Sequence, residues 1–411
     1  MSSIDLKFPD QCGNNDNLLG KLDPTVKADS SVCSEEPCKQ PRGDIHSDPN
    51  RGTDHHHVND EPPSQVPIAI VGMAVRLPGG VRSTDSFWDL LLSQKDVSRE
   101  VPQDRYNIDA FYSDTQSRAV KTRRGFFLDH DLADTDPSAF KMWGTEAGHM
   151  DPQQRLLLEV VWECMENAGQ VDWRGKDIGC YVGNFGEDWL EMSMRDPLFT
   201  SRYHVFGASD FALSNRISYE YDLRGPSLTI RSACSASMSG LHVACQSVAS
   251  KECSSAVVAG SSIFLTPTMT KCMSENMVLA PDGACKTFDR NADGFARGEA
   301  VNAVYIKRLD DAVRDGDPIR AVIRATMNTC DGQSSSLAIP SADAQESLIR
   351  KIYTRAGIAD PTKTGLFECH GTGTSAGDLA ETEAISRVFG EKGVHIGAVK
   401  PNVGRPKVPL V

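Results

Sequence analysis

Short apolar runs alternate with amphipathic segments from Pro67 onward. The run at residues 68–72 has the pattern of a buried strand, and helical spacing of apolar residues follows at 86–92. Further strands are predicted at residues 178–183, 227–230, 254–260, 301–306, 321–325, 365–368 and 395–399. Further helices are predicted at 238–249, 344–356 and 379–389. This alternation predicts a layered α/β protein.

A helix with clear boundary signals follows Asp151. Asp151 suits the N-cap and Pro152 the first helical position, while Gln154 stands where a capping box has its second partner. Gly169 can end the helix. Its apolar positions share one face of the helix: Leu157, Val160, Val161, Cys164 and Ala168.

Residues 1–66 differ from the rest of the chain. They are rich in Asp, Asn, Ser, Pro and Gly, so they bury too little apolar surface to offset their ordering entropy, and we expect a disordered N-terminal extension. Three cysteines and the run His55 to His57 leave two interpretations, a metal site and a solvated tail. The spacing matches no zinc pattern, which favours the tail.

Composition narrows the class of protein. With 39% hydrophobic residues and a net charge of −13, the chain has an ordinary apolar share and no basic stripe, which argues against nucleic acid as a partner. An apolar run of about 18 residues is absent, as is the pattern of a secretory signal, so we expect a cytoplasmic protein without a membrane span. Most of the 12 cysteines should then be reduced and buried.

One cysteine has a context that suggests chemistry. Residues 225–245 begin as a strand, pass through small residues around Cys234, and continue with helical spacing. A thiol at a helix N-terminus meets free backbone N–H groups and the positive end of the helix dipole, which favour the nucleophilic thiolate. Taken alone, the pattern also fits a buried cysteine in a tight turn.

The same stretch resembles the active-site motif of β-ketoacyl synthases, Gly-Pro-Ser-x-Thr-x-Asp-Thr-Ala-Cys-Ser-Ser-Ser. The resemblance makes Cys234 the nucleophile that accepts an acyl group. Two positions depart from the motif: Arg231 replaces its Asp, and Ala236 replaces the middle serine. The charge reversal at Arg231 leaves two outcomes open, a more stable thiolate or disturbed local packing.

The resemblance extends over residues 67–404, within a ketosynthase domain that we place at residues 67–411. It includes the opening strand with residues 76–79, the helix at 150–159, and the segments at 213–219 and 281–283. Arg297 and Glu299 match a family loop, where a structural salt bridge is the favoured interpretation. The residues of several motifs are similar to those of fungal highly reducing type I polyketide synthases. The resemblance implies a thiolase-like five-layer fold of two βαβαβ-type halves, the second incomplete, and no nucleotide cofactor.

A second motif supplies the predicted catalytic histidine. Glu368-Cys-His370-Gly-Thr-Gly-Thr374 resembles the family's Glu-x-His-Gly-Thr-Gly-Thr, and the match continues through Gly377, Asp378 and Glu381. In the family, two histidines assist decarboxylation of a malonyl thioester and hold the enolate oxygen. The resemblance assigns the first of these roles to His370.

The third motif is incomplete. Residues 399–405 are similar to the family's Val-Lys-Ser-Asn-Ile-Gly-His, so Lys400 matches the family lysine and Arg405 stands in place of the second histidine. An arginine donates hydrogen bonds but cannot shuttle a proton near neutral pH. The sequence then ends at Val411, and we interpret residues 67–411 as a C-terminally truncated domain.

Two functions remain open at this point. The first is decarboxylative Claisen condensation of acyl and malonyl thioesters, with acyl carrier protein and its 4′-phosphopantetheine as partner and no cofactor bound to this chain. The second is an inactive truncated remnant, at most a dimerising fragment, because Arg405 replaces a histidine. Family members form homodimers, which the truncation makes doubtful here. The sequence favours weak or no condensation.

Overall fold

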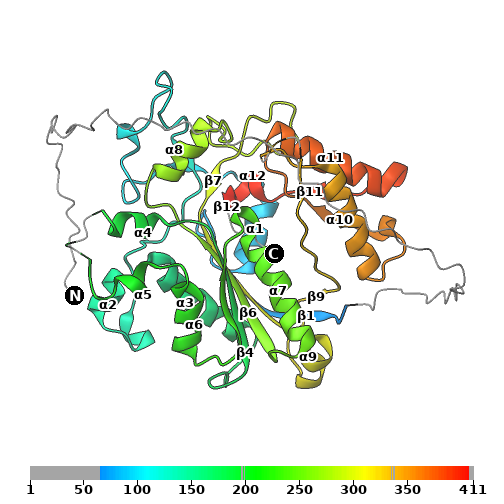
Figure 1. Cartoon of the computed structure of the whole chain (residues 1–411), viewed down its shortest axis with the longest axis horizontal. Coiled ribbons are helices and arrows are strands. Elements are labelled where there is room, and N and C mark those ends of the chain that lie inside the picture. Colours follow the sequence, from blue (N-terminus) through cyan, green and yellow to red (C-terminus); the bar gives the residue numbers. More distant parts are fainter. Residues whose placement is uncertain (1–64, 196–197, 199, 335, 337, 407–411) are drawn as a thin grey trace, which may run out of the picture. The chain divides into compact units, whose positions relative to one another are not determined.

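The computed structural model describes residues 65–195, 198, 200–334, 336 and 338–406. The predicted disordered extension, with its cysteines and its run of histidines, falls almost entirely outside the described residues. The described chain is an α/β structure in which helices cover a central mixed sheet (Figure 1).

The central sheet has six strands in the order β5-β4-β6-β8-β1-β9. β5, β4 and β6 run parallel, whereas β8, β1 and β9 are each antiparallel to their neighbour. In chain order, the bounds are β1 Ile68–Arg76, β4 Ile178–Asn184, β5 Ser227–Ile230, β6 Ser255–Ser262, β8 Ala300–Arg308 and β9 Ala321–Ile323. The six predicted strands of this sheet are thus present, with shifted ends.

The two faces of this sheet bury different helices (Figure 1). On one face, α3 (Pro152–Asn167) and α6 (Ala212–Tyr221) pack on side chains such as Val71 of β1. On the other, α7 (Ala236–Ser250) packs on residues such as Ile70. Successive strand residues point to opposite faces, so the near-continuous apolar runs in the sequence correspond to strands buried on both sides.

The start of α3 differs from the predicted capping box. Asp151 is the N-cap, but its carboxylate accepts hydrogen bonds from the backbone N–H (2.8 Å) and the side chain (3.0 Å) of Gln153. Gln154 instead donates to the carbonyl oxygens of Phe206 and Gly207, at 3.0 and 3.1 Å. A tertiary contact 52 residues away therefore takes the side chain that the local pattern assigned to the cap.

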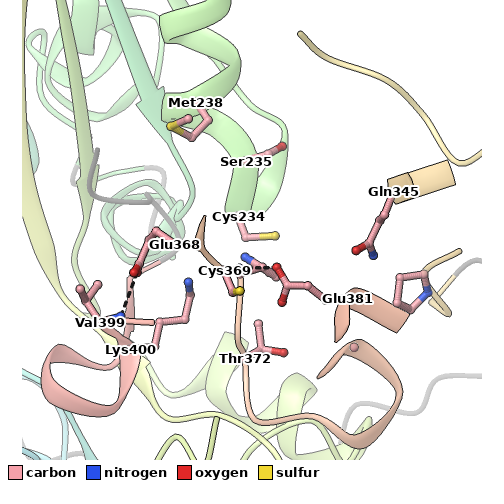
Figure 2. A pocket seen from close by; sticks show the side chains of 13 residues that line it. Cys234, Ser235, Met238, Gln345, Glu368, Cys369, Thr372, Glu381, Val399 and Lys400 are labelled. Atoms are coloured by element: carbon pink, nitrogen blue, oxygen red, sulfur yellow. Dashed lines mark hydrogen bonds between the residues drawn. The ribbon is translucent and has the colours of Figure 1, made fainter. Parts of the chain in front are cut away.

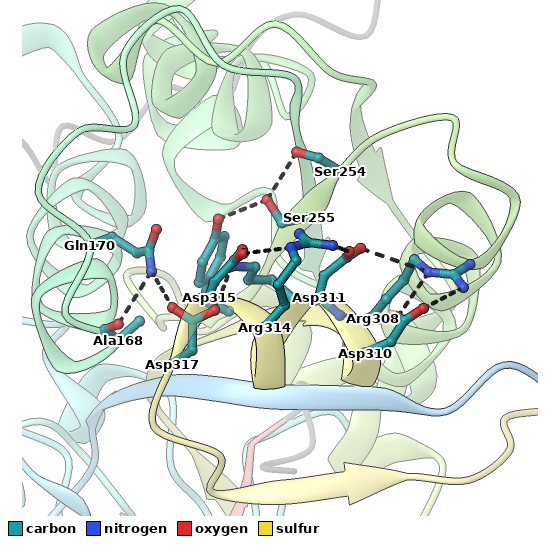
Figure 3. Close-up of polar contacts among 12 residues, drawn as sticks. Ala168, Gln170, Ser254, Ser255, Arg308, Asp310, Asp311, Arg314, Asp315 and Asp317 are labelled. Atoms are coloured by element: carbon teal, nitrogen blue, oxygen red, sulfur yellow. Dashed lines mark hydrogen bonds and ion pairs between the residues drawn. The ribbon is translucent and has the colours of Figure 1, made fainter.

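A polar network ties the far end of β8 to its neighbours (Figure 3). Lys307 forms ion pairs with Asp315, at 2.7 Å, and with Asp317. Asp317 also accepts a hydrogen bond from Gln170 at 3.0 Å, just beyond α3. The network thereby fastens α9 (Leu309–Asp315) to the sheet and to the C-terminal end of α3.

The remaining secondary structure after β9 is smaller. Helices α10 (Ala342–Arg355) and α11 (Ser375–Phe389) pack against each other, beside a parallel pair of two-residue strands, β10 (Phe367–Glu368) and β11 (Ile396–Gly397). Both strands lie where the sequence predicted longer ones. Within the described residues after 338, the outer edge of β11 has no partner strand, and Ile396 is 41% exposed.

Short elements complete the fold. The remaining strands are β2 Arg99–Glu100, β3 Arg124–Gly125, β7 Arg297–Gly298 and β12 Arg405–Pro406. The remaining α-helices are α1 Thr84–Leu92, α2 Gly144–His149, α4 Asp188–Ser193, α5 His204–Ala208, α8 Thr268–Glu275 and α12 Lys400–Val403. The 3₁₀ turns are η1 Ile108–Ala110, η2 Pro137–Phe140, η4 Ala233–Ser235, η5 Pro361–Lys363 and η6 Gly390–Lys392.

Glu299 forms a structural salt bridge, as expected, but its partner is not Arg297. Buried Glu299 pairs with Arg105 at 2.8 Å and also accepts from the backbone N–H groups of Leu128 and Phe264. Arg297 instead stacks on the ring of Phe264, 3.7 Å from its centroid. Burial lowers the pKa of Arg297. Arg105 lies 194 residues from Glu299, so local sequence gives no sign of the pair.

None of the helices in the described part of the chain combines the length and the apolar character that crossing a membrane requires.

Candidate active site

Two neighbouring cavities share Cys234 and His370 in their walls. The first, about 580 Å³, is also lined by Lys400; the second, about 640 Å³, is also lined by Arg405. All four predicted site residues therefore meet at one place, although Cys234 is 136 residues before His370 in the sequence. Figure 2 shows the first cavity, with Cys234 at the end of a helix facing the segment that contains Cys369.

Cys234 lies in the turn between β5 and α7, as the sequence predicted. It belongs to η4, and α7 begins two residues later and runs for 15 residues. Ala233 has a φ of 54°, a left-handed conformation that is unusual for a residue with a side chain. Ser235 closes the turn through its side chain, which donates to the carbonyl oxygen of Ser232 at 2.8 Å.

The first turn of α7 is packed closely against β4. A Cβ atom on Gly183 of β4 would lie 2.3 Å from the backbone N of Ser237 and 2.6 Å from the carbonyl carbon of Ala236. Only glycine permits this approach without a shift of the backbone. Ala236 is fully buried, so its methyl group fits a place where a serine hydroxyl would need a partner.

Arg231 lies just before the turn that contains Cys234, and two carboxylates bind its side chain. Its guanidinium forms ion pairs with Glu187 and, at 3.2 Å, with Asp210. β5 still pairs with β4 as far as Ile230, so the substitution does not disturb the strand. The charge reversal relative to the motif is therefore balanced by acidic groups on other segments of the chain.

His370 lies in a sharp turn between β10 and α11. Gly371 and Gly373 have φ values of 45° and 75°, which explains why glycine occupies both positions. The side chain of Thr287 donates to the carbonyl oxygen of Gly371 at 2.6 Å. The backbone N–H of Gly294 donates to the carbonyl oxygen of Gly373 at 2.9 Å. The segment at 286–294 thus braces the turn from outside.

Two acidic residues of α11 hold the same turn from inside. Glu381 accepts from the backbone N–H groups of His370 and Gly371 at 2.5 and 2.8 Å. Asp378 accepts from those of Gly373 and Phe288, at 3.0 and 2.7 Å. The sequence identified both acids as part of a motif but not their role. Their spacing of three residues, which puts both on one helix face, was the available signal.

Lys400 is buried at the start of α12, with 8% of its surface exposed. Burial and the nearby charge of Arg405 lower its pKa, opposed by Glu368 and Glu381. Glu368 also accepts a hydrogen bond from the backbone N–H of Val399 at 2.9 Å, which joins the end of β10 to the residue before Lys400 (Figure 2).

Arg405 lies directly beside His370. Its Nη2 donates to His370 Nε2 at 3.2 Å, and its guanidinium stacks on the ring of Phe295, 4.2 Å from the centroid. Burial, with Arg405 and then Lys400 nearby, lowers the pKa of His370 to about 3. These causes favour the neutral imidazole, and part of the residue is exposed at the cavity.

Cys369 shows that position in this cavity is not enough to activate a thiol. Its side chain lines the same cavity as Cys234, but it is buried, and burial raises its pKa to about 12. Within the described residues, no three His, Cys, Asp or Glu side chains are arranged to hold a metal ion. The arrangement can support covalent chemistry on Cys234 next to a neutral imidazole and two cations.

The chain matches both parts of a known family. Residues 65–312 match the β-ketoacyl synthase N-terminal domain, and residues 320–408 match the β-ketoacyl synthase C-terminal domain. Cys234 falls in the first match, and His370, Lys400 and Arg405 fall in the second.

Curated relatives and solved structures agree with this match. A highly reducing polyketide synthase of a Fusarium species is 56% identical, and one of Glarea lozoyensis is 53% identical, each over 82% of this chain. The chain spans only 14% of each of these proteins.

A ketosynthase from module 6 of the bacillaene synthase of Bacillus subtilis superimposes with a TM-score of 0.74 at 36% identity, covering 82% of this chain and 58% of that one. An oxazolomycin ketosynthase domain of Streptomyces albus gives a TM-score of 0.75 at 33% identity, covering 82% and 60%. These likenesses confirm the predicted thiolase-like fold class, and they give no support to the interpretation as an inactive remnant. The chain belongs to the β-ketoacyl synthase family.

Proposed function

We propose that the chain is the ketosynthase of a highly reducing polyketide synthase and catalyses decarboxylative Claisen condensation between acyl and malonyl thioesters. The observation that carries the proposal is the convergence of Cys234 and His370 on the two shared cavities. A nucleophile at a helix N-terminus beside a neutral imidazole suits covalent acyl transfer.

In the first step, the Cys234 thiolate attacks the carbonyl carbon of an acyl thioester. The bond to the carrier's sulfur breaks, and the carrier thiolate leaves and takes up a proton. The result is an acyl group on Cys234 Sγ.

In the second step, a malonyl thioester loses CO2. The bond between its carboxylate carbon and α-carbon breaks, and the electron pair becomes a thioester enolate with its charge on the carbonyl oxygen. The α-carbon then attacks the acyl carbonyl carbon on Cys234 and expels the thiolate. We assign His370 and Lys400, together with Arg405, to the site that serves the enolate.

The thioesters in this proposal are carried on the 4′-phosphopantetheine of an acyl carrier protein, as substrate and partner. The shared cavities have the size of a small-molecule site, so an extended arm with an acyl unit can reach Cys234. A second copy of the chain is the other proposed partner. β5 is an edge strand of the central sheet, with Leu228 46% exposed, and edge strands pair readily with a further strand.

The experiment that tests this function separates the two steps. The purified chain is incubated with an acyl pantetheine thioester, and its intact mass reports acylation. Malonyl carrier protein is then added, and CO2 and the β-ketoacyl product are measured. We expect acylation of the parent chain, followed by CO2 release and product. The Cys234→Ala variant should lose acylation by at least about a thousandfold.

Cys272→Ala is the matched control, because Cys272 is an exposed thiol outside the two cavities. It should be acylated like the parent chain. Acylation of Cys234→Ala at the parent's rate, or acylated parent chain that yields neither CO2 nor product, would contradict the proposed function.

A further inference from the structure

The contact between Arg405 and His370 fixes the state of the imidazole. A guanidinium has only donors, so in the 3.2 Å contact His370 Nε2 must be the acceptor. A neutral imidazole whose Nε2 accepts has its proton on Nδ1. The Nε2 atom of His370 is thus already used, and it has no proton to offer a substrate oxygen.

Arg405 itself has donors left over. Its guanidinium has five N–H groups, of which the contact with His370 uses one. Its Nε is buried without a hydrogen-bond partner, and no carboxylate within the described residues forms an ion pair with it. The side chain lines the same cavity as Cys234. The guanidinium of Arg405, which has no carboxylate partner and retains free donors, therefore lines the cavity in which an acyl group on Cys234 would lie.

We propose that Arg405 contacts the enolate oxygen formed on decarboxylation, and that His370 is a positioning residue whose Nε2 orients the guanidinium. This inference rests on the proposed function and changes the role that the family motif implies for His370. It assigns to this chain an oxyanion site built on a permanent cation. No proton needs to move to that oxygen when CO2 leaves.

The packing around Arg405 supports this role. Its stacking on Phe295 and its backbone N–H, which donates to the carbonyl oxygen of Ala296 at 2.8 Å, fix the side chain at both ends. A donor that is already oriented stabilises a developing charge without reorganisation during the reaction.

The surroundings of His370 are consistent with a ring that only accepts. The charged and titratable groups that line the two cavities with it are Arg405 of β12, Lys400 of α12, Glu368, Cys369 and Glu381 beside the turn, the Cys234 thiol, and Asp293, which is paired with Lys286 at 2.8 Å. The burial and the two cations that hold its pKa near 3 disfavour a second proton on the ring. Removal of Arg405 removes one of these causes, so the pKa of His370 should rise.

The test compares Arg405→Met, Arg405→His and the parent chain, each as the full 411-residue protein acylated on Cys234. Malonyl pantetheine thioester is the probe, and CO2 release is followed from about pH 5 to pH 8. Arg405→Met should acylate within about twofold of the parent chain and release CO2 about 10² to 10³ times more slowly. Arg405→His should retain more activity at acid pH but lose it as pH rises, because its imidazole gives up its positive charge in that range. The matched control is Arg314→Met, an exposed arginine on α9.

Selective ¹⁵N labelling of histidine gives a second readout that does not need substrate. In the parent chain, the His370 signal, assigned by its loss in His370→Gln, should show a neutral ring with the proton on Nδ1 and no titration over the same pH range. In Arg405→Met, the ionisation should move up in pH. A proton on Nε2 in the parent chain, or CO2 release by Arg405→Met at the parent's rate, would overturn the inference. Failure of Cys234 to acylate would instead overturn the proposed function, while the NMR measurement would still decide the state of His370.

Discussion

The cysteine side and the histidine side of the proposed active site are held by strands of very different length. Cys234 follows β5 in a sheet whose central strands β4, β6 and β8 are seven to nine residues long and almost entirely buried. His370 follows β10, which has two residues and a single two-residue partner, β11. The proposed nucleophile is placed by a large core, whereas the histidine is placed by a turn.

This difference shows that a precise position can be reached in two ways. On the cysteine side, backbone contact between β4 and α7 fixes the turn. On the histidine side, the carboxylates of Glu381 and Asp378 accept hydrogen bonds from the backbone N–H groups of residues 370, 371 and 373. Polar bonds compensate there for the small extent of the strands, and we expect that side of the site to open more readily.

Hydrogen exchange should show the largest difference between the two sides. The amides of Val258 and Val304, inside the central sheet, should exchange only on global unfolding. Those of Phe367 and Cys369, which bond to His395 and Gly397 across β10 and β11, should exchange by local opening, at least about 100 times faster. Mass spectrometry of exchanged peptides measures this. Equal protection of both sets would show that the two sides unfold together.

Gly183→Ala should be the most damaging small substitution on the cysteine side. The added Cβ would lie 2.3 Å from backbone N of Ser237, so α7 must move. We expect a loss of about 1–3 kcal/mol in the free energy of unfolding, and slower acylation of Cys234, measured by denaturation and intact mass. Gly148→Ala is the control, since its Cβ would meet nothing within 4 Å. A Gly183→Ala chain as stable and as reactive as this control would contradict the packing argument.

Glu381→Gln tests the polar support on the histidine side. One carboxylate oxygen becomes an amide N–H₂ that faces a backbone donor, so either His370 or Gly371 loses its acceptor. The cost should be about 1–2 kcal/mol, seen as roughly tenfold slower CO2 release with acylation of Cys234 unchanged. Glu383→Gln alters an exposed acid of the same helix and should leave both steps as they are. A parallel loss of acylation would show that Glu381 supports the whole site.

The smallest expected effect is the pH dependence of stability that Asp151, the N-cap of α3, contributes. Burial raises the pKa of Asp151 to about 6, so the folded state favours the protonated carboxyl. The stability that this group contributes is present below its unfolded pKa of about 4 and is lost as pH rises through about 6. Asp151→Asn should gain stability relative to the parent over that interval, on the order of 1 kcal/mol, as a rise in Tm.

Asp136→Asn is the counterpart of that variant at an exposed cap. Hydrogen bonds from Ser138 lower the pKa of Asp136, so its charged form is the favoured one. The pH trend of this variant relative to the parent should therefore have the opposite sign. The same trend in both variants would mean that burial does not govern Asp151.

The sequence predicted the parts of this molecule that depend on local pattern. Residues 178–183 are a strand because their side chains are buried on both faces of the sheet, and residues 227–230 form the partly exposed edge strand beside it. Cys234 lies at the predicted strand-to-helix turn. Gln154 was assigned the wrong partner and the partner of Glu299 was not identified, because Gly207 and Arg105 are distant in sequence. The bond from Arg405 to His370 depends on packing of segments 35 residues apart, which periodicity does not report.

The two carboxylates around Arg231 have a consequence for how this chain can change. Restoring the aspartate of the family motif at this position would gather three negative charges where Glu187 and Asp210 now share one positive charge. The ancestral-looking residue would be the unfavourable one in this background. Reversion by consensus design should therefore succeed only if Glu187 and Asp210 are altered with it, because the charges at the three positions depend on one another.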